Sequence, residues 1–431
     1  MFDKTIFHID VNSAFLSWEA VHRLGHRGAR LDLRTVPSAV GGDISMRHGI
    51  ILAKSIPAKK YGVRTGESIP EALQKCPELV IVPPNYELYD KTSKAFIELL
   101  KEYTPDVEQY SVDEAFADMT GTAGLWGDPV SAAERLRNQV RQELGFTVNI
   151  GVSQNKLLAK MASDFKKPDQ VHTLFREEIY DKMWPLPVED LFFVGRATSR
   201  KLYNMGIHTI GDLAQTSPDI LRAHLKKHGE VIWNFANGRD VSVVEKDPPA
   251  NKSYGNSTTI AFDVTDPGTA KMVLLALAET VASRMRKDGV KAEMAAVGIK
   301  DFEFHYTGHQ RVLQSATNIT QEIHRAAVQL FDELWDGRPV RHLGLWAGRI
   351  REAECSRQLI LFDGTDYEKL EKMDMAVDDV RRKFGIDAIK RAAFVHTGSG
   401  PKSLNENNID HMSGGISRER RHVDYDKVQI L

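Results

Sequence analysis

The sequence has few cysteines, no long apolar run and almost no net charge. Its 431 residues include two cysteines, Cys76 and Cys355, which lie far apart and in no metal-ligand spacing. This argues against a disulfide scaffold or a structural zinc site, and indicates a reducing compartment, by default the cytoplasm. The longest apolar stretch, which begins at Met272, is interrupted by Glu279. We therefore expect neither a membrane span nor a signal peptide.

The charges nearly cancel, since 57 lysines and arginines face 59 acidic residues, for a formal net charge of -2. The overall balance gives no sign of a nucleic-acid partner, so any such surface must be local. The length exceeds the size at which one hydrophobic core usually keeps growing, which predicts several domains.

Strands alternate with helices in the first half. Residues 4–11 (KTIFHIDV) have the pattern of a strand and residues 12–24 that of a helix, which places Asp10 where the two meet. Further on, a strand precedes a short helix that is entered through Pro57 and stopped at Gly62. This half is predicted to be α+β or α/β.

Three carboxylates in this half, on Asp10, Asp113 and Glu114, suggest a metal site. Neighbouring side chains on a regular strand point to opposite faces, so Asp113 and Glu114 can converge only if the chain turns or bulges there. A central sheet could bring them to Asp10, and such oxygen ligands suit magnesium in phosphoryl transfer. The alternative is a solvated hairpin tip, with Asp10 a helix-start residue that the helix dipole favours.

The second half changes character. Residues 188–217 predict two short helices around a turn at Gly195, with Gly206 ending the next helix, as in a helix-hairpin-helix unit. Residues 245–257 have the composition of a linker, and a module of helices and strands follows. Near the end, an amphipathic helix over 367–385 is expected to pack locally through its apolar residues, and the Ser/Gly/Arg-rich end is expected to be disordered.

Five stretches together resemble the Y-family, the translesion DNA polymerases of the bacterial polymerase IV and polymerase V group. They are IDVNSAF, YSVDEAF, NIGVSQNKLLAKMASDFKKP, FFVGRATSRKLYNMGIHTIGDL and KSYGNSTT, and the likeness runs in order to about residue 352. The resemblance implies a DNA-directed DNA polymerase of low fidelity without proofreading. In the reaction of this family, the primer 3'-OH attacks the α-phosphate of a dNTP.

The resemblance also implies an α+β multidomain fold with a flexible C-terminal tail. A ferredoxin-like palm, fingers, a thumb with the helix-hairpin-helix and a little finger would follow one another along the chain. Their expected ranges are 1–21 and 83–175 for the palm, 22–82 for the fingers, 176–245 for the thumb, 252–352 for the little finger and 353–431 for the tail.

The resemblance assigns roles at the palm. Asp10, Asp113 and Glu114 match the carboxylates that bind two magnesium ions, with the Val11 carbonyl as a further ligand. Asn12 stands where many members have a second aspartate that is not a ligand. Phe15 matches the steric gate that excludes a ribose 2'-OH, although a core aromatic on a helix is the alternative.

The fingers depart from the family pattern. Members often grip the triphosphate with a tyrosine and an arginine, and these positions are Ile56 and Lys59 here. Lysine keeps the charge but loses the bidentate fork, and isoleucine supplies no hydroxyl. Lys167 matches a lysine that contacts the triphosphate, so Lys59 and Lys167 are the expected dNTP ligands. A solvated helix end is the alternative for Lys167.

DNA contacts are expected in the thumb and little finger. Gly195 would offer backbone N–H groups to a DNA phosphate, although Ala197 replaces the second glycine of the usual turn and a purely structural hairpin is the alternative. In the little finger, Lys252, Arg284 and Arg286 are the expected phosphate contacts, with Lys287 and Lys291 as further candidates.

The stretch QLILF resembles the peptide by which such polymerases bind the sliding clamp, through Gln358, Leu359, Leu361 and Phe362. The expected partners are therefore primer-template DNA, dNTPs and the β clamp, with no membrane and a monomeric chain.

Two other functions remain open. Ile56 and Lys59 allow a catalytically weak, polymerase-like scaffold that is recruited to DNA and the clamp. A metal-dependent nucleotidyl cyclase with a related palm is disfavoured by the thumb and the clamp-like peptide.

Overall fold

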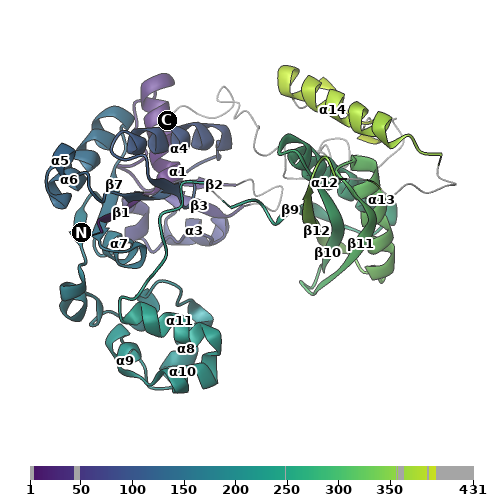
Figure 1. The fold of residues 1–431 in the computed structure, drawn as a ribbon. Helices are drawn as coiled ribbons and strands as arrows, with labels where there is room; N and C mark the ends of the chain where they lie inside the picture. The colour runs from purple at the N-terminus through teal and green to yellow at the C-terminus, as the bar shows by residue number, and fades with distance from the viewer. Residues whose placement is uncertain are drawn as a thin grey trace.

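The computed structural model describes residues 4–42, 49–247, 249–355, 357, 364–385 and 388–394. The clamp-like residues Gln358, Leu359, Leu361 and Phe362 lie outside the described residues, as does the Ser/Gly/Arg-rich end. Figure 1 shows the described part as two mixed bodies of sheets and helices and a cluster of short helices.

The first body contains a five-stranded sheet, which we call the palm sheet, with strand order β5-β6-β1-β7-β8. Every residue of its middle strand β1 is buried except Asp10, which is half-buried, as expected of a strand covered on both faces. The strands are β1 (Ile6–Val11), β5 (Val107–Gln109), β6 (Glu114–Asp118), β7 (Val148–Ser153) and β8 (Val171–Thr173).

Helices cover both faces of the palm sheet. Phe7 and Ile9 of β1 share a core with helices α1, α4 and α6, whereas Ile6 packs with Ala159 of α7 on the other face. Helix α7 lies so close that a Cβ on Gly151 of β7 would stand 1.9 Å from the Ala159 carbonyl oxygen. The helices are α1 (Ala14–His26), α4 (Tyr86–Lys101), α5 (Ala123–Trp126), α6 (Pro129–Gln139), which continues as a π-helical turn (Val140–Leu144), and α7 (Lys156–Ser163).

A smaller, three-stranded sheet, the fingers sheet, has strand order β3-β2-β4. Its helix α2 begins as predicted with Pro57 in its first turn, where the Ser55 side chain accepts a hydrogen bond from the Ala58 N–H. Gly62, with a φ of 79°, follows the helix end. The elements are β2 (Ser38–Gly41), β3 (Ile51–Lys54), α2 (Ile56–Lys60), α3 (Ile69–Lys75) and β4 (Val80–Val82).

The cluster of short helices, the thumb helices, has its own apolar core. Its α-helices are α8 (Arg196–Asn204), α9 (Ile210–Gln215), α10 (Pro218–Leu225) and α11 (Lys227–Ala236). The helix expected before Gly195 is only a 3-10 turn, Val188–Asp190. Pro187 stands just before this turn and Phe193 adopts a φ of 74° soon after it, so the segment has no room for a longer helix.

The second body contains a four-stranded antiparallel sheet, the little-finger sheet, with strand order β11-β10-β12-β9. Helices α12 and α13 share its apolar core. Its elements are β9 (Ser253–Val264), α12 (Pro267–Lys287), β10 (Val290–Asp301), β11 (Tyr306–Thr317), α13 (Thr320–Leu334) and β12 (Val340–Glu352). Within the described ranges, no helix is long and apolar enough to cross a membrane.

Helix α14 (Tyr367–Phe384) contacts α12, and ion pairs form part of this contact. Its Asp374 is 2 % exposed, whereas Met373 and Phe384 are 47 % and 68 % exposed. The expectation that the apolar residues of this helix form its packing face is therefore wrong for these two. The helix repeat places Asp374 and Arg381 on the buried side, and both meet opposite charges there.

Arg286 of α12 is part of this ionic contact. Its side chain is 6 % exposed, with Nε 2.7 Å from Asp378 Oδ2 and Nη1 3.2 Å from Asp374 Oδ2. The prediction that Arg286 contacts a DNA phosphate is at odds with this arrangement, because its guanidinium is already buried and paired. Lys291 is likewise paired with Glu371 of α14.

We expect Asp374→Ala to release α14 from the little-finger sheet. The change would leave Arg286 and Arg391 short of a buried partner and the Thr320 N–H without its acceptor. Breaking such a buried pair typically costs about 3–5 kcal/mol. Hydrogen exchange of the α14 amides should accelerate accordingly. Asp379→Ala, which removes an exposed pair with Arg382, is the control. Equal exchange in the two variants would contradict this account.

Candidate active site

A pocket of about 360 Å³ lies between the palm sheet and the fingers sheet. Its lining contains most of the palm and fingers residues that the sequence singled out: Asp10, Val11, Phe15, Lys59, Asp113 and Lys167. Ile56, Lys54 and Thr65 are among the other residues on its fingers side. Residues far apart in the sequence are therefore brought to one cavity.

The antiparallel register of β1 and β6 places Asp10 directly opposite Glu114. The chain turns just before β6, where the N–H groups of Tyr110 and Ser111 both donate to the Glu114 carbonyl. The Asp113 carbonyl in turn accepts a hydrogen bond from the Val11 N–H, at an N–O distance of 3.0 Å. This turn is what the adjacent acids required, and it brings the backbone of Asp113 beside the end of β1.

Asp10 carries a large electrostatic penalty. Burial, together with the hydrogen bond and the negative charge of Glu114, raises the pKa of Asp10 to about 7, although the nearby Lys167 acts in the opposite direction. Lys167 Nζ lies 2.9 Å from Asp10 Oδ1 and 2.8 Å from Asp164 Oδ1. Without a bound cation, Asp10 therefore holds a proton near neutral pH far more readily than an exposed aspartate would.

Glu114 keeps its charge. Burial by itself would raise the pKa of Glu114, but hydrogen bonds with His8 and Asp10 and the positive charge of Lys160 hold it well below its usual value. Lys160, which is 8 % exposed, has its Nζ 3.0 Å from Glu114 Oε1. The same Nζ lies 5.5 Å from the ring centre of Phe192, at the start of the thumb helices.

This donor set fits a hard cation. Two half-buried carboxylates on neighbouring strands offer the oxygen ligands that a divalent ion prefers. Ligand atoms that could share one metal ion are expected within 4.8 Å of one another. The carboxylate oxygens of Asp10, Asp113 and Glu114 do not all meet this spacing. Asp113 instead accepts a hydrogen bond of 2.8 Å from the Ser111 hydroxyl, and Asp10 pairs with Lys167.

A buried amide network holds the loop that carries Lys167. Asn12 Nδ2 donates to Asn149 Oδ1 at 3.1 Å, and Asn12 Oδ1 accepts from the Asp169 N–H at 2.9 Å. Asn149 Nδ2 donates to the Lys166 carbonyl at 2.8 Å. The asparagine that replaces a second aspartate therefore has a structural task, and a carboxylate could not donate the bond to Asn149.

Phe15 is fixed by other aromatic rings. It is half-buried near the start of α1, stacked on Tyr89 with ring centres 4.4 Å apart and planes 9° from parallel. Trp18 and Tyr86 pack around the same ring. Because the ring also lines the pocket, it is a rigid wall there rather than a purely internal core residue.

The expected DNA-binding residues lie elsewhere. Gly195 precedes α8, and a Cβ placed on it would meet nothing within 4 Å, so its backbone faces open space. Lys252 is exposed and Arg284 is half-buried. The pocket does not include any of these three residues.

Sequence reasoning missed three residues of the site, namely His8, Lys160 and Lys54. Lys160 gave a partial signal, because lysines recur near helical spacing on α7. Lys54 alternates with buried residues along β3. This pattern indicates that the residue is less buried than its neighbours, but it does not indicate a function. His8 looks like an ordinary strand residue.

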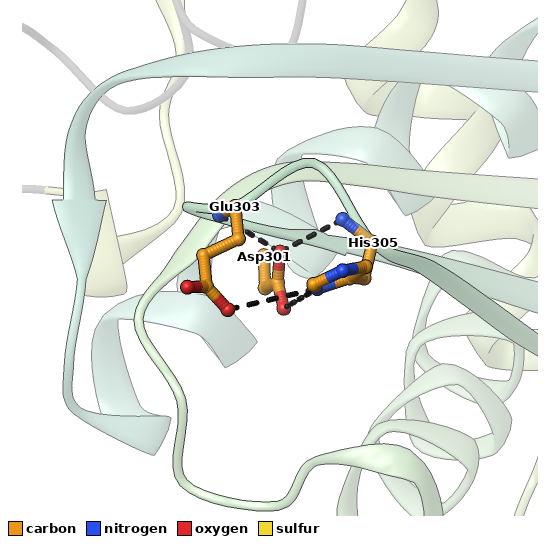
Figure 2. A group of neighbouring side chains, drawn as sticks. All are labelled: Asp301, Glu303 and His305. Carbon is orange, nitrogen blue, oxygen red and sulfur yellow. Dashed lines mark hydrogen bonds and ion pairs between the residues drawn. The ribbon is translucent and has the colours of Figure 1, made fainter.

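Figure 2 shows a second cluster, Asp301, Glu303 and His305, at the β10–β11 hairpin of the little-finger sheet. Among the described residues, this is the one group of three His, Cys, Asp or Glu side chains whose potential ligand atoms all lie within 4.8 Å of one another. Asp301 Oδ1 accepts the N–H groups of Glu303 and His305, and Arg338 lies 3.4 Å from Oδ2. The Asp301 carboxylate thus already closes the hairpin turn.

Comparison with known families agrees with the motifs. The model of the impB/mucB/samB family matches residues 9–164, and that of the impB/mucB/samB family C-terminal domain matches residues 251–361. The model of the DNA polymerase-iota thumb domain matches residues 189–240.

Curated relatives match most of the chain. DNA polymerase IV of Clostridium acetobutylicum is 42 % identical over 393 residues, which cover 91 % of this chain and 98 % of the relative. DNA polymerase IV of Acetivibrio thermocellus is 39 % identical over 397 residues, with the same coverage of 91 % and 98 %. DNA polymerase IV 2 of Bacillus subtilis is 36 % identical over 401 residues, which cover 91 % of this chain and 95 % of the relative.

Among solved structures, a Y-family DNA polymerase chimera is similar with a TM-score of 0.69 and 21 % identity, over 80 % of this chain and 99 % of that one. This likeness concerns the fold, and it confirms the expected multidomain α+β architecture. Together with the matched family models and the relatives, it establishes that the chain belongs to the impB/mucB/samB family of Y-family DNA polymerases.

Proposed function

We propose that this protein is a template-directed DNA polymerase that carries out translesion synthesis on primer-template DNA with dNTP substrates. The observation that carries the proposal is the pocket itself. Asp10 and Asp113 line one side of the pocket, and Lys54 and Lys59 line the other. These two lysines have no carboxylate partner among the described residues. Family membership and relatives named DNA polymerase IV support the same conclusion.

Asp10, Asp113 and Glu114 are the proposed ligands of two magnesium ions, with the Val11 carbonyl as a further ligand. When bound, the ions would lower the pKa of the primer 3'-OH and stabilise the charge that develops on the leaving pyrophosphate. The protein itself holds Glu114 ionised, in part through Lys160. It also raises the pKa of Asp10 to about 7, so that a cation would compete with a proton for this carboxylate near neutral pH.

Lys167 and Lys59 are the proposed contacts to the triphosphate. Lys167 is held beside Asp10 by the loop that Asn12 and Asn149 fix, so its charge would stand beside phosphates bound in the pocket. Its bond to Asp10 must yield when the carboxylate takes up a cation.

Phe15 is the proposed steric gate, because its ring is immobilised by stacking and forms a wall of the pocket. For DNA, we propose phosphate contacts at the Gly195 backbone, at Lys252 and at Arg284. We propose that the QLILF peptide binds the β clamp and that the chain acts as a monomer. We also propose that the protein works in the cytoplasm, where its DNA template lies.

A catalytically weak scaffold is the second candidate, since Ile56 lines the pocket where a hydrogen-bonding side chain is common in the family. The first experiment separates the two. Primer extension with Mg²⁺ and all four dNTPs, on undamaged and abasic templates, should show synthesis by the natural protein. Primer-template binding without any extension would instead identify a scaffold.

Asp113→Asn removes one charge at constant shape, and we expect it to reduce extension by roughly three orders of magnitude. Primer-template affinity, measured by fluorescence anisotropy, should stay unchanged. Asp118→Asn is the matched control, because this acid caps the other end of β6 and lies outside the pocket. Extension by Asp113→Asn at the natural rate would reject the metal assignment.

Phe15→Ala should admit ribonucleotides, because it removes the wall against which a 2'-OH would collide. The ratio of kcat/KM for dNTP to that for rNTP should fall at least roughly ten-fold, while Phe15→Tyr, which keeps the bulk of the ring, should preserve it. If sugar selectivity is the same in the alanine variant, another residue is the gate.

A further inference from the structure

Strand β3 presents Lys54 to the pocket. Along this strand Ile51 is fully buried in the fingers, whereas Leu52, Ala53 and Lys54 all line the pocket. The Lys54 side chain is half-buried and lines the cavity.

Among the described residues, the Lys54 ammonium is held by a hydroxyl and not by a carboxylate. Its Nζ donates to the Thr65 hydroxyl at 3.1 Å, and Thr65 itself lines the pocket. Across the described ranges, neither Lys54 nor Lys59 has a carboxylate oxygen within 4 Å. Glu67, whose charge also acts on Lys54, is in direct contact with Lys75.

Two positive charges close together in this pocket are costly. Burial and the charge of Lys59 both lower the pKa of Lys54, with a smaller opposing effect from Glu67. Such a pair is relieved when an anion binds between them. Lysine is a compact point charge with three donors, which suits a phosphate oxygen that needs no planar, bidentate recognition.

The opposite side of the pocket determines what the anion can be. Asp10 and Asp113 would repel a bare anion there, so the ligand must be anionic toward the fingers and carry cations toward the palm. A nucleoside triphosphate with its divalent ions has this charge pattern. Ile56, on the same side of the pocket, offers no donor, so the lysines must supply the contacts.

We propose that Lys54 binds the triphosphate of the incoming nucleotide together with Lys59, replacing the hydroxyl that Ile56 does not supply. The inference rests on the proposed polymerase function and adds a substrate-binding residue to it. Lys54 acts on the affinity for the nucleotide and not on the affinity for primer-template DNA.

The test compares Lys54→Met, which keeps the aliphatic stem, with Lys60→Met, an exposed lysine of α2 outside the pocket. Single-nucleotide insertion should show a KM for each of the four dNTPs raised roughly ten-fold in Lys54→Met, with kcat changed much less. Lys54→Arg should restore most of the affinity, and Lys60→Met should behave as the natural protein. The Kd for primer-template DNA should be the same in all four proteins.

A second readout needs no catalysis. Calorimetric titration with inorganic tripolyphosphate and Mg²⁺ should show weaker binding to Lys54→Met than to Lys60→Met. If the natural protein extends primers but the two variants share one KM and one tripolyphosphate affinity, the role of Lys54 is overturned. A raised Kd for primer-template DNA in place of a raised KM would overturn it too, by assigning Lys54 to the DNA. If the natural protein fails to extend primers, the polymerase proposal fails, and the tripolyphosphate titration still decides whether Lys54 binds phosphates.

Discussion

The register of two antiparallel strands, which sets Asp10 opposite Glu114, is the constraint on which the site depends. Two carboxylates brought together away from water repel each other, and the protein contains the cost in two ways. Lys160 and His8 hold Glu114 ionised, while Asp10 retains a proton to an unusually high pH. In the proposed function, a bound divalent ion would relieve the repulsion between the two carboxylates.

The remaining parts of the site arrange charge around this pair. Asn12 and Asn149 fix the loop that sets Lys167 beside Asp10, and the fingers sheet presents Lys54 and Lys59 from the other side. Lys160 also touches Phe192, so the ion pair that supports Glu114 reaches the start of the thumb helices. A substrate with phosphates on one side and cations on the other matches this distribution.

Much of the fold and the acidic half of the site could be predicted from the sequence. The strand-to-helix junction at Asp10, the turn before Glu114 and the helix entered through Pro57 follow from local patterns, and collinear motifs supplied the family. Lys160 and Lys54 could not be assigned, because their roles depend on which element packs over which. The α14 helix shows the same limit. Its apolar residues suggested a packing face, but Asp374 and Arg381 meet buried opposite charges on α12 that only the tertiary fold brings near.

Counting bound ions tests the central claim most directly. The natural protein would be combined with a dideoxy-terminated primer-template and the matching dNTP, and titrated with Mn²⁺ under electron paramagnetic resonance. The account predicts about two tightly bound ions per complex, and the loss of tight binding in Asp10→Asn. Equal Mn²⁺ binding by the natural protein and Asp10→Asn would contradict it, because the opposed carboxylates would then not be what holds the metal.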